Sequence, residues 1–120
     1  NGNSARDILF TDYMKQWLEK MKLQIRPTTY SGYHDNVYGI IIPYFKPMKL
    51  KLREVTPKHI QDFYTKQRQR VKGTTVKSYH ANIHKAFKDA RKLQLIDSNP
   101  MECVDPPRHI LLRKLKKYLC

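Results

Sequence analysis

The sequence has few cysteines and no long apolar run. Its 120 residues include only two cysteines, Cys103 and Cys120, which form no close-spaced pair. This spacing argues against a disulfide framework, so we expect two reduced thiols in a cytoplasmic protein. The longest apolar stretch, residues 38–45, is interrupted by Gly39 and Pro43 and is far too short to cross a bilayer. With no signal peptide either, a membrane is not an expected partner.

Acidic side chains are also scarce. Ten Asp and Glu stand against 24 Lys and Arg, which gives a formal net charge of +14. So large an excess in a small domain indicates an anionic partner, and nucleic acid is the first candidate. Eight tyrosines lie among the basic residues, whereas a disordered polycation would be poor in aromatic side chains. The length and the 40% apolar content predict one folded basic domain with a modest core. Since the chain has no initial Met, we expect it to be a piece of a longer protein.

No stretch alternates with period two for long enough to predict a strand, and residues 50–55 come nearest. Four segments have helical periodicity instead, which predicts an all-α fold of four packed helices. The predicted helices run from about Thr11 to Met21, from Pro27 to Ile41, from Pro57 to Arg70 and from Thr74 to Lys92. Their expected core residues are Phe10, Met14, Trp17, Leu18, Met21, Tyr30, Tyr33, Val37, Ile41, Ile60, Phe63, Tyr64, Val76, Tyr79, Ile83, Ala86, Phe87 and Ala90.

Local signals mark where these helices start and stop. Thr11 can cap the first helix, and Thr56 can cap the third, which then begins at Pro57. Pro43 and Pro47 are expected to break the chain after the second helix.

The second and fourth predicted helices open alike, with RPTTYSGYH and KGTTVKSYH. Short hydroxyl side chains let a helix lie close to a phosphate backbone, and the helix N-terminus adds free N–H groups and a positive dipole end. Lys and Asn can then reach base edges in the major groove. The predicted DNA-binding residues, on the exposed sides of these helices or at their starts, are Arg26, Thr28, Thr29, Ser31, Asn36, Lys72, Thr74, Thr75, Lys77, Ser78, Asn82 and Lys85.

Each Thr-Thr pair has a simpler interpretation, because Ser and Thr at helix starts are usually caps. Capping is the favoured interpretation of either pair taken alone. Two such helices in a chain of charge +14 favour double-stranded DNA as the partner. Other basic residues, such as Arg68, are expected to be solvated.

The histidines do not indicate a metal site. His80 and His84 are four residues apart and share a helix face, but His80 is followed by Ala81 where the metalloprotease pattern has Glu. Cys103 with His109 is a weaker candidate still. We therefore predict surface or boundary histidines, with neither a metal nor another cofactor.

Residues 109–120 are strongly basic and carry no acidic side chain. We interpret them as a basic linker after a domain that spans residues 1–108. An amphipathic segment that binds a membrane surface or a partner protein is the alternative.

Four segments in a fixed order carry a further pattern, and they are FTDYMKQWLEKMK, RPTTYSGYHDNVYGIIIPYF, KLREVTPKHIQDFYTKQ and GTTVKSYHANIHKAFKDARKLQLIDSNPMECVDPPR. Their informative positions are Trp17–Leu18, Thr29–Tyr30 with Tyr33, Leu52 to Ile60, and Ala86–Phe87 through Asn99–Pro100. From about residue 8 to 108, the chain resembles the N-terminal core-binding domain of phage and transposon integrases, the tyrosine recombinase family.

The resemblance implies a four-helix orthogonal bundle of the SAM-like kind that clamps one side of recombination-site DNA. It implies that the second and fourth helices lie against the major groove, and that the basic tail leads to a catalytic domain of the same parent chain. A cytoplasmic protein, bacterial or phage-encoded and monomeric in isolation, is expected.

The catalytic residues of that family, among them an H-x-x-R pair and a nucleophilic Tyr, belong to the second domain. No His in this chain is followed three residues later by Arg, since HILLR has the wrong spacing. Tyr118 has no constellation to activate it. The fragment is therefore expected to bind DNA without cutting it.

Two other functions stay open at this point. A helix-turn-helix regulator would need a short helix–Gly turn–helix unit, to which Lys72–Gly73 comes closest. A protein-interaction bundle with a merely solvated basic face would bind DNA weakly and without a localised footprint.

Overall fold

The structure, a computed structural model, describes residues 7–104. The predicted domain boundary at residue 108 and the predicted linker 109–120, with Tyr118 and Cys120, lie outside the described residues. His109, the partner of Cys103 in the weak metal hypothesis, lies outside them too.

The described chain is helical, as predicted. Its elements are α1 (Phe10–Lys22), α2 (Pro27–Asn36), the π-helical turn η2 (Val37–Ile41), α3 (Ile42–Phe45), the 3₁₀ turns η3 (Lys46–Met48) and η4 (Leu52–Glu54), α4 (Pro57–Arg68), α5 (Gly73–Lys92) and the 3₁₀ turn η5 (Pro100–Cys103). Between residues 7 and 104 the one extended pairing is an isolated antiparallel bridge between Leu9 and Lys51. The predicted all-α class is confirmed.

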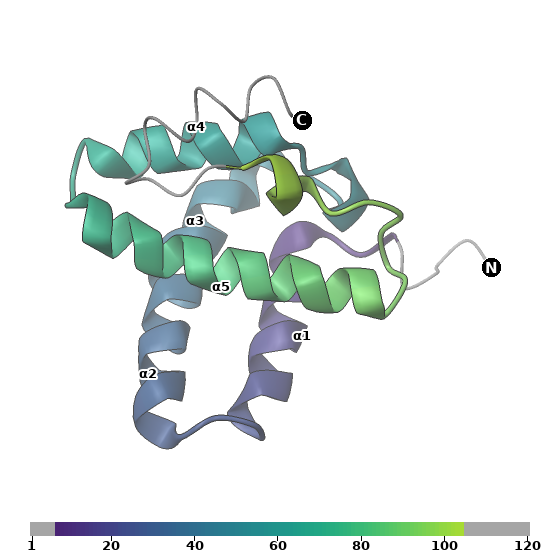
Figure 1. The fold of residues 1–120 in the computed structure, drawn as a ribbon, viewed down its shortest axis with the longest axis horizontal. Coiled ribbons are helices and arrows are strands. Elements are labelled where there is room, and N and C mark those ends of the chain that lie inside the picture. The colour runs from purple at the N-terminus through teal and green to yellow at the C-terminus, as the bar shows by residue number, and fades with distance from the viewer. Residues whose placement is uncertain (1–6, 105–120) are drawn as a thin grey trace.

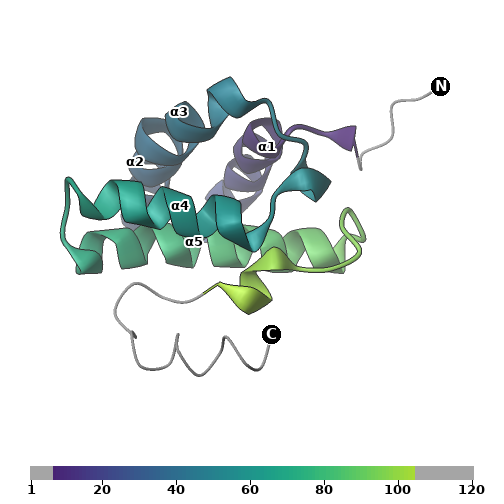
Figure 2. The same ribbon diagram turned by 90° about the horizontal axis from the view of Figure 1, so that it is seen from above.

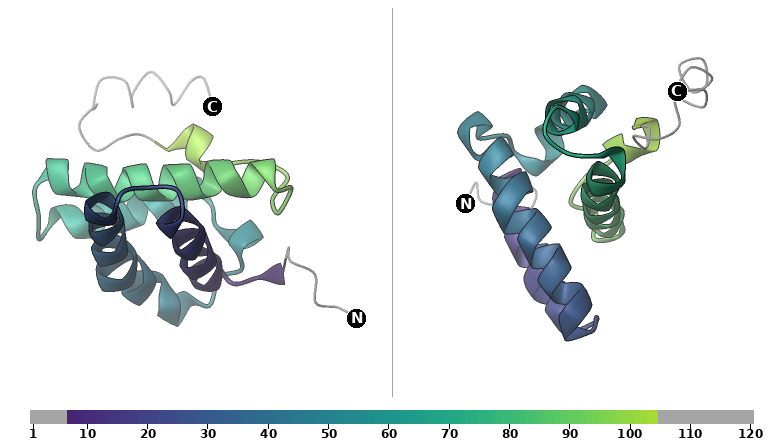
Figure 3. Two further views of the ribbon diagram at one scale, coloured as in Figure 1. Left: turned by 90° about the horizontal axis from the view of Figure 1, so that it is seen from below. Right: turned by 90° about the vertical axis from the view of Figure 1, so that its left-hand side faces the viewer.

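The helices form two antiparallel hairpins that cross steeply. One hairpin consists of α1 and the path from α2 through η2 to α3, and the other consists of α4 and α5 (Figure 1). Seen from above, α4 and α5 lie side by side and run across the first hairpin (Figure 2). The side view in Figure 3 looks nearly along α4 and α5 while α1 and α2 run diagonally across the picture. This is the orthogonal bundle that the resemblance implies.

The core is built around the four phenylalanines of the chain, each from a different helix. Phe10 of α1 lies 5.0 Å from Phe45 of α3 and 5.4 Å from Phe87 of α5, measured between ring centroids. Phe63 of α4 lies 5.4 Å from Phe45. Aromatic pairs at these distances add packing energy beyond the area that they bury. The four rings therefore fasten both hairpins to one another.

The predicted core residues of the first, third and fourth predicted helices are all buried. In the second predicted helix, Val37 and Ile41 are buried, whereas Tyr30 and Tyr33 are half-buried at its edge. Tyr33 still packs on the core, since its ring stacks on that of Trp17 with the centroids 5.8 Å apart.

The predicted cap of the first helix is wrong. The helix α1 begins at Phe10, so Thr11 already lies inside it, and Leu9 occupies the N-cap position without a side-chain hydrogen bond. Tertiary pairing sets this start, because the Phe10 N–H donates to Leu50 O at 2.8 Å. The stretch 50–55, the nearest to a strand in the sequence, forms the isolated bridge with residues 8–10, in which Leu52 N–H also donates to Ile8 O at 2.8 Å, and then the turn η4.

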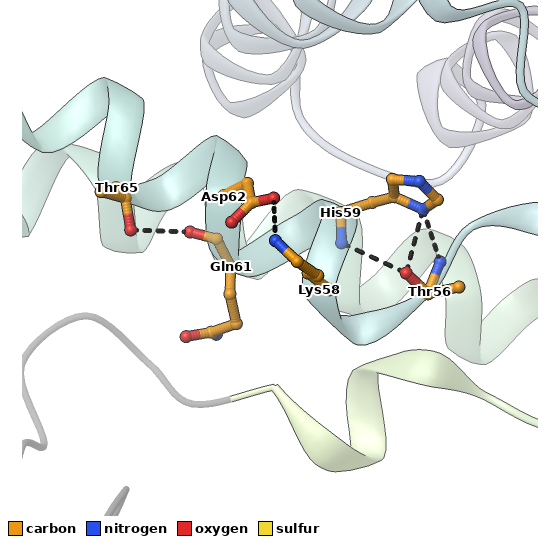
Figure 4. A network of polar contacts seen from close by, with 6 residues as sticks. All are labelled: Thr56, Lys58, His59, Gln61, Asp62 and Thr65. Carbon is orange, nitrogen blue, oxygen red and sulfur yellow. Dashed lines mark hydrogen bonds and ion pairs between the residues drawn. The ribbon is translucent and has the colours of Figure 1, made fainter.

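The predicted start of the third helix is confirmed in α4. Thr56 is the N-cap and Pro57 the first helical residue. The Thr56 hydroxyl oxygen accepts from the His59 backbone N–H at 3.3 Å, while His59 Nδ1 accepts from the Thr56 N–H at 3.0 Å (Figure 4). His59 thus takes the place that Glu or Gln has in a usual capping box.

The predicted break at Pro43 is wrong, because the helical path continues from Pro27 through Pro43 to Phe45. The break at Pro47 is confirmed, since the α-helical path ends at Phe45 and the 3₁₀ turn η3 closes at Lys49 with a φ of 51°. The turn η2 explains how Pro43 is accommodated. Ile42 donates its N–H to Val37 O, five residues back, so the ladder is already widened where Pro43 lacks a donor. The path therefore keeps Val37, Ile41 and Phe45 against the core.

Phe87 provides a test of the core. It is fully buried and stacked on Phe10, so Phe87→Ala should lower the free energy of unfolding by about 3–5 kcal/mol. Urea unfolding followed by circular dichroism measures this loss. The exposed neighbour gives the control, since Lys88→Ala should change stability by less than about 0.5 kcal/mol. A loss below about 1 kcal/mol for Phe87→Ala would contradict the described core.

A second test concerns alkaline pH. Tyr13 is buried and donates to Ala86 O at 2.7 Å, and burial, with a smaller contribution from the charge of Asp89, raises the pKa of its phenol well above the usual value. An unfolded tyrosine ionises near pH 10, so stability is at its full value below that pH and falls as the pH rises above it. From about pH 8 to about pH 11, Tyr13→Phe should lose about 1 kcal/mol less stability than the wild-type protein does, measured by urea unfolding. Equal losses would contradict this assignment.

Candidate nucleic-acid interface

The helices α2 and α5 cross near the end of α2, and a pair of asparagines marks the crossing. Asn36 Nδ2 donates to Asn82 Oδ1 at 2.9 Å and lies 3.5 Å from Ser78 Oγ. Trp17 supports this arrangement from α1, because its ring stacks on Tyr33 of α2 and its Nε1 donates to Asp89 Oδ2 of α5 at 2.9 Å. Three helices are therefore held together where the two predicted DNA-facing helices meet.

The polar face of α2 runs from this crossing back to the start of the helix. Residues four, seven and eight positions before Asn36 share its face, and they are Gly32, Thr29 and Thr28. All three are exposed, and a Cβ added to Gly32 would meet nothing within 4 Å. We call these four residues the α2 face. Its side chains are short, so a flat or ridged partner can approach the helix backbone closely.

A matching face runs along α5 in the other direction from the crossing. Residues four, seven and eight positions before Asn82 are Ser78, Thr75 and Thr74, and we call these four residues the α5 face. The hydroxyl of Ser78 donates to Thr75 O at 2.6 Å. The two faces therefore join at the asparagine pair, and each ends at a helix N-terminus; the two N-termini lie well apart in the molecule (Figure 1).

Basic side chains flank both faces. Arg26 and Lys72 occupy the N-cap positions of α2 and α5, and Lys77 and Lys85 project from α5; all four are exposed. Each helix start thus combines a cation, a positive dipole end and N–H groups that have no partner within the helix. This combination suits phosphate oxygens.

Most of the predicted DNA-binding residues lie where the sequence places them. Nine are exposed, and these are Arg26, Thr28, Thr29, Ser31, Lys72, Thr74, Lys77, Ser78 and Lys85. Asn36 and Thr75 are half-buried. Asn82 differs, since it is only 2% exposed, and its predicted place on the exposed side is wrong. The sequence held a signal for its burial, because Asn82 lies three residues after Tyr79 and four before Ala86, within the apolar arc of α5.

The capping interpretation of the Thr-Thr pairs is also wrong. Each helix begins one residue before its Thr-Thr pair, at Pro27 in α2 and at Gly73 in α5. The N-cap residues are Arg26 and Lys72, and neither helix start has a hydrogen bond from a capping side chain. Both pairs therefore occupy the second and third helical positions, where a Thr hydroxyl does not cap the helix.

One feature of the turn between α4 and α5 was not predicted. The side chain of Gln67 is buried, and its Oε1 accepts from Arg70 Nη2 at 2.9 Å. Arg68, which was expected to be solvated, donates from Nη1 to Val71 O at 2.9 Å. Both guanidinium groups are thus held by groups of the turn that leads into α5. The sequence held a signal for the burial of Gln67, because it lies seven, four and three residues after Ile60, Phe63 and Tyr64, on the apolar stripe of α4.

The histidine pair joins α4 to α5. His80 Nδ1 lies 2.6 Å from the hydroxyl of buried Tyr64, and the ring centroids of His80 and His84 lie 5.7 Å apart. Across residues 7–104, no group of three or more His, Cys, Asp or Glu side chains could hold a metal ion. Within the same part of the chain, no helix has the length and apolar character that a membrane span requires.

The fold and part of the chain have counterparts among known proteins. The family model for the phage integrase N-terminal SAM-like domain matches residues 9–68, which include α1 to α4 but not α5. The chain is also similar to the solution NMR structure of a protein fragment from Clostridium leptum. That comparison has a TM-score of 0.68 and 20% sequence identity, and it covers 84% of this chain and 90% of the other. At this identity the likeness shows the fold alone. No curated protein sequence matches the chain.

Alanine substitutions can test the positions of the threonines. Thr28→Ala and Thr74→Ala should leave the free energy of unfolding unchanged or raise it by a few tenths of a kcal/mol, because neither residue caps and Ala has the higher helix propensity. Thr56→Ala is the matched comparison and should lower stability by about 1 kcal/mol, since Thr56 does cap α4. Thermal unfolding of the three variants measures the difference. Equal losses in all three would mean that the Thr-Thr pairs are caps after all.

Proposed function

The chain belongs to the family of phage integrase N-terminal SAM-like domains, and from this premise we propose that it binds double-stranded DNA as the core-binding domain of a site-specific tyrosine recombinase. The observation that carries the proposal is the meeting of the α2 face and the α5 face at the Asn36–Asn82 pair. The N-terminal SAM-like domain is a non-catalytic part of integrases. The proposed task is therefore to clamp recombination-site DNA for integration or excision while another domain cuts it.

Phosphate binding follows from the two helix starts. Phosphate oxygens accept hydrogen bonds from free backbone N–H groups and from hydroxyls, and both are present at Thr28 to Thr29 and at Thr74. The Thr75 N–H already donates to Lys72 O at 3.0 Å, so Thr75 would contribute its hydroxyl. Arg26 and Lys72 add charge at the same two places. Because the two starts lie well apart on crossing helices, the domain would contact the backbone at two separate places (Figure 1).

Base contacts would come from the middle of the surface. The small side chains of both faces let the helices enter the major groove, where Asn36 and Ser78 lie close enough to the crossing to reach base edges. Lys77 and Lys85 flank the α5 face and would track the phosphates of the groove. The buried Asn82 would act through Asn36 and not by direct contact.

The proposal also includes the expected partners and location. The catalytic domain would come from the same parent chain, and the isolated fragment would be a monomer. A DNA recombinase of bacterial or phage origin would work in the cytoplasm, where the DNA is.

An NMR titration of the labelled chain with a short mixed-sequence duplex, at two salt concentrations, tests this function. We expect amide shifts to concentrate at residues 26–36 and 72–85 and to weaken steeply at the higher salt, because counterion release dominates phosphate binding. Shifts spread evenly over all lysines, or absent at moderate salt, would instead favour a protein-interaction bundle with a solvated basic face.

Charge substitutions sharpen the test. Lys77→Gln should weaken duplex binding and reduce the slope of log K against log salt by about 1, since one phosphate contact is lost. Lys15→Gln removes the same charge from the exposed side of α1 and should leave that slope nearly unchanged. Fluorescence anisotropy with a labelled duplex measures both variants. Equal slopes for the two variants would show that only net charge matters.

A further inference from the structure

One polar side chain of α5, Asn82, is buried within the apolar arc of the helix. Among residues 7–104, the buried polar side chains are Gln67 and Asn82. Burying a carboxamide is costly unless it is hydrogen-bonded, and an apolar side chain of similar shape often packs at least as stably. Asn82 accepts its hydrogen bond from Asn36, on the other DNA-facing helix. The pair thus does more than fill the core, because it fixes the orientation of a surface side chain.

The orientation decides what Asn36 can offer to a ligand. Its amino group, Nδ2, is directed at Asn82 Oδ1, with Ser78 Oγ on the same side. The oxygen and nitrogen of a planar carboxamide diverge from the same carbon, so with Nδ2 directed at Asn82 the Asn36 Oδ1 is not, and no hydrogen bond within the described chain engages it. Asn36 is half-buried at the point where the two faces join. It therefore presents an acceptor, while its donor group is already used.

We infer that Asn36 determines sequence specificity by accepting a hydrogen bond from the exocyclic amino group of a DNA base, and that Asn82 is the positioning residue that holds it. The inference rests on the proposed DNA binding. In the major groove, only cytosine N4 and adenine N6 are amino donors. Guanine O6 and thymine O4 are acceptors, and each would oppose another acceptor at Asn36 Oδ1.

The locked orientation also distinguishes the two amino bases. An unconstrained Asn pairs with adenine through two hydrogen bonds, to N6 and N7. Asn36 lacks a free donor for N7, so it loses the advantage that adenine usually has, whereas cytosine needs only the acceptor. Removing the hydrogen bond between Asn36 and Asn82 should therefore raise the affinity for adenine relative to cytosine at the same position.

The first experiment identifies the base and removes its amino group. The 120-residue chain would select duplexes from a randomised pool at one fixed salt concentration. Affinities would then be measured with the selected duplex and with one in which the contacted cytosine is replaced by 2-pyrimidinone, or the contacted adenine by purine. Each analogue lacks only the exocyclic amino group. The wild-type protein should lose about 5- to 10-fold in affinity, whereas Asn36→Ala should bind both duplexes equally.

The second experiment tests the positioning role. Asn82→Leu removes the acceptor and puts an apolar side chain of the same branching in its place, and in the folded variant it should shift the adenine-to-cytosine affinity ratio upwards by about 3-fold or more. Gln67→Met is the matched control, since it replaces the other buried carboxamide, which holds Arg70 and not Asn36. It should leave the base ratio unchanged.

The outcomes separate the two proposals. If the wild-type chain binds no duplex, the proposed function fails, and this inference fails with it. If the wild-type chain selects a site but Asn36→Ala loses as much affinity as wild type when the amino group is removed, the inference fails alone. An unchanged base ratio in a folded Asn82→Leu would overturn the positioning role. Because Asn36 is half-buried and not part of the apolar core, the first experiment decides the matter even if Asn82→Leu does not fold.

Discussion

The fold depends on the contact between four buried phenylalanines at the crossing of the two hairpins. Phe10, Phe45, Phe63 and Phe87 come from α1, α3, α4 and α5, and none of them exceeds 1% exposure. Each hairpin alone would expose one side of this cluster to water, so neither buries its apolar face without the other. The steep crossing angle follows, and with it the place where α2 passes over α5. The asparagine pair at the centre of the candidate interface lies at that crossing.

The interface is accordingly a product of two helices that are far apart in sequence. Asn36 and Asn82 are 46 residues apart along the chain but share a hydrogen bond of 2.9 Å, and the α2 and α5 faces extend from it in two directions. The apolar core fixes the angle between the helices, and the asparagine pair fixes the side chain at their junction. Stability and the proposed recognition thus rest on different residues: the phenylalanines hold the scaffold, and short polar side chains cover its outer surface.

Much of the helical structure was predictable from local sequence patterns. The four helices, their apolar stripes and the start of α4 at Thr56 and Pro57 follow from periodicity and capping chemistry, which act within a few residues. The exceptions have nonlocal causes. The start of α1 depends on the hydrogen bond between Phe10 and Leu50. The continuation through Pro43 depends on core packing that stabilises the π-helical turn η2.

The sequence by itself determined the class of the fold, the basic character of the chain and the two helix starts rich in threonine, because composition and periodicity are properties of the chain alone. Tertiary structure decided which polar residues are at the surface. It buried Asn82 under α2, left the threonine pairs exposed or half-exposed without a capping role, and oriented Arg70 through Gln67. The physical reason is that burial and hydrogen bonding depend on what the second hairpin covers, and no short window of sequence contains that partner.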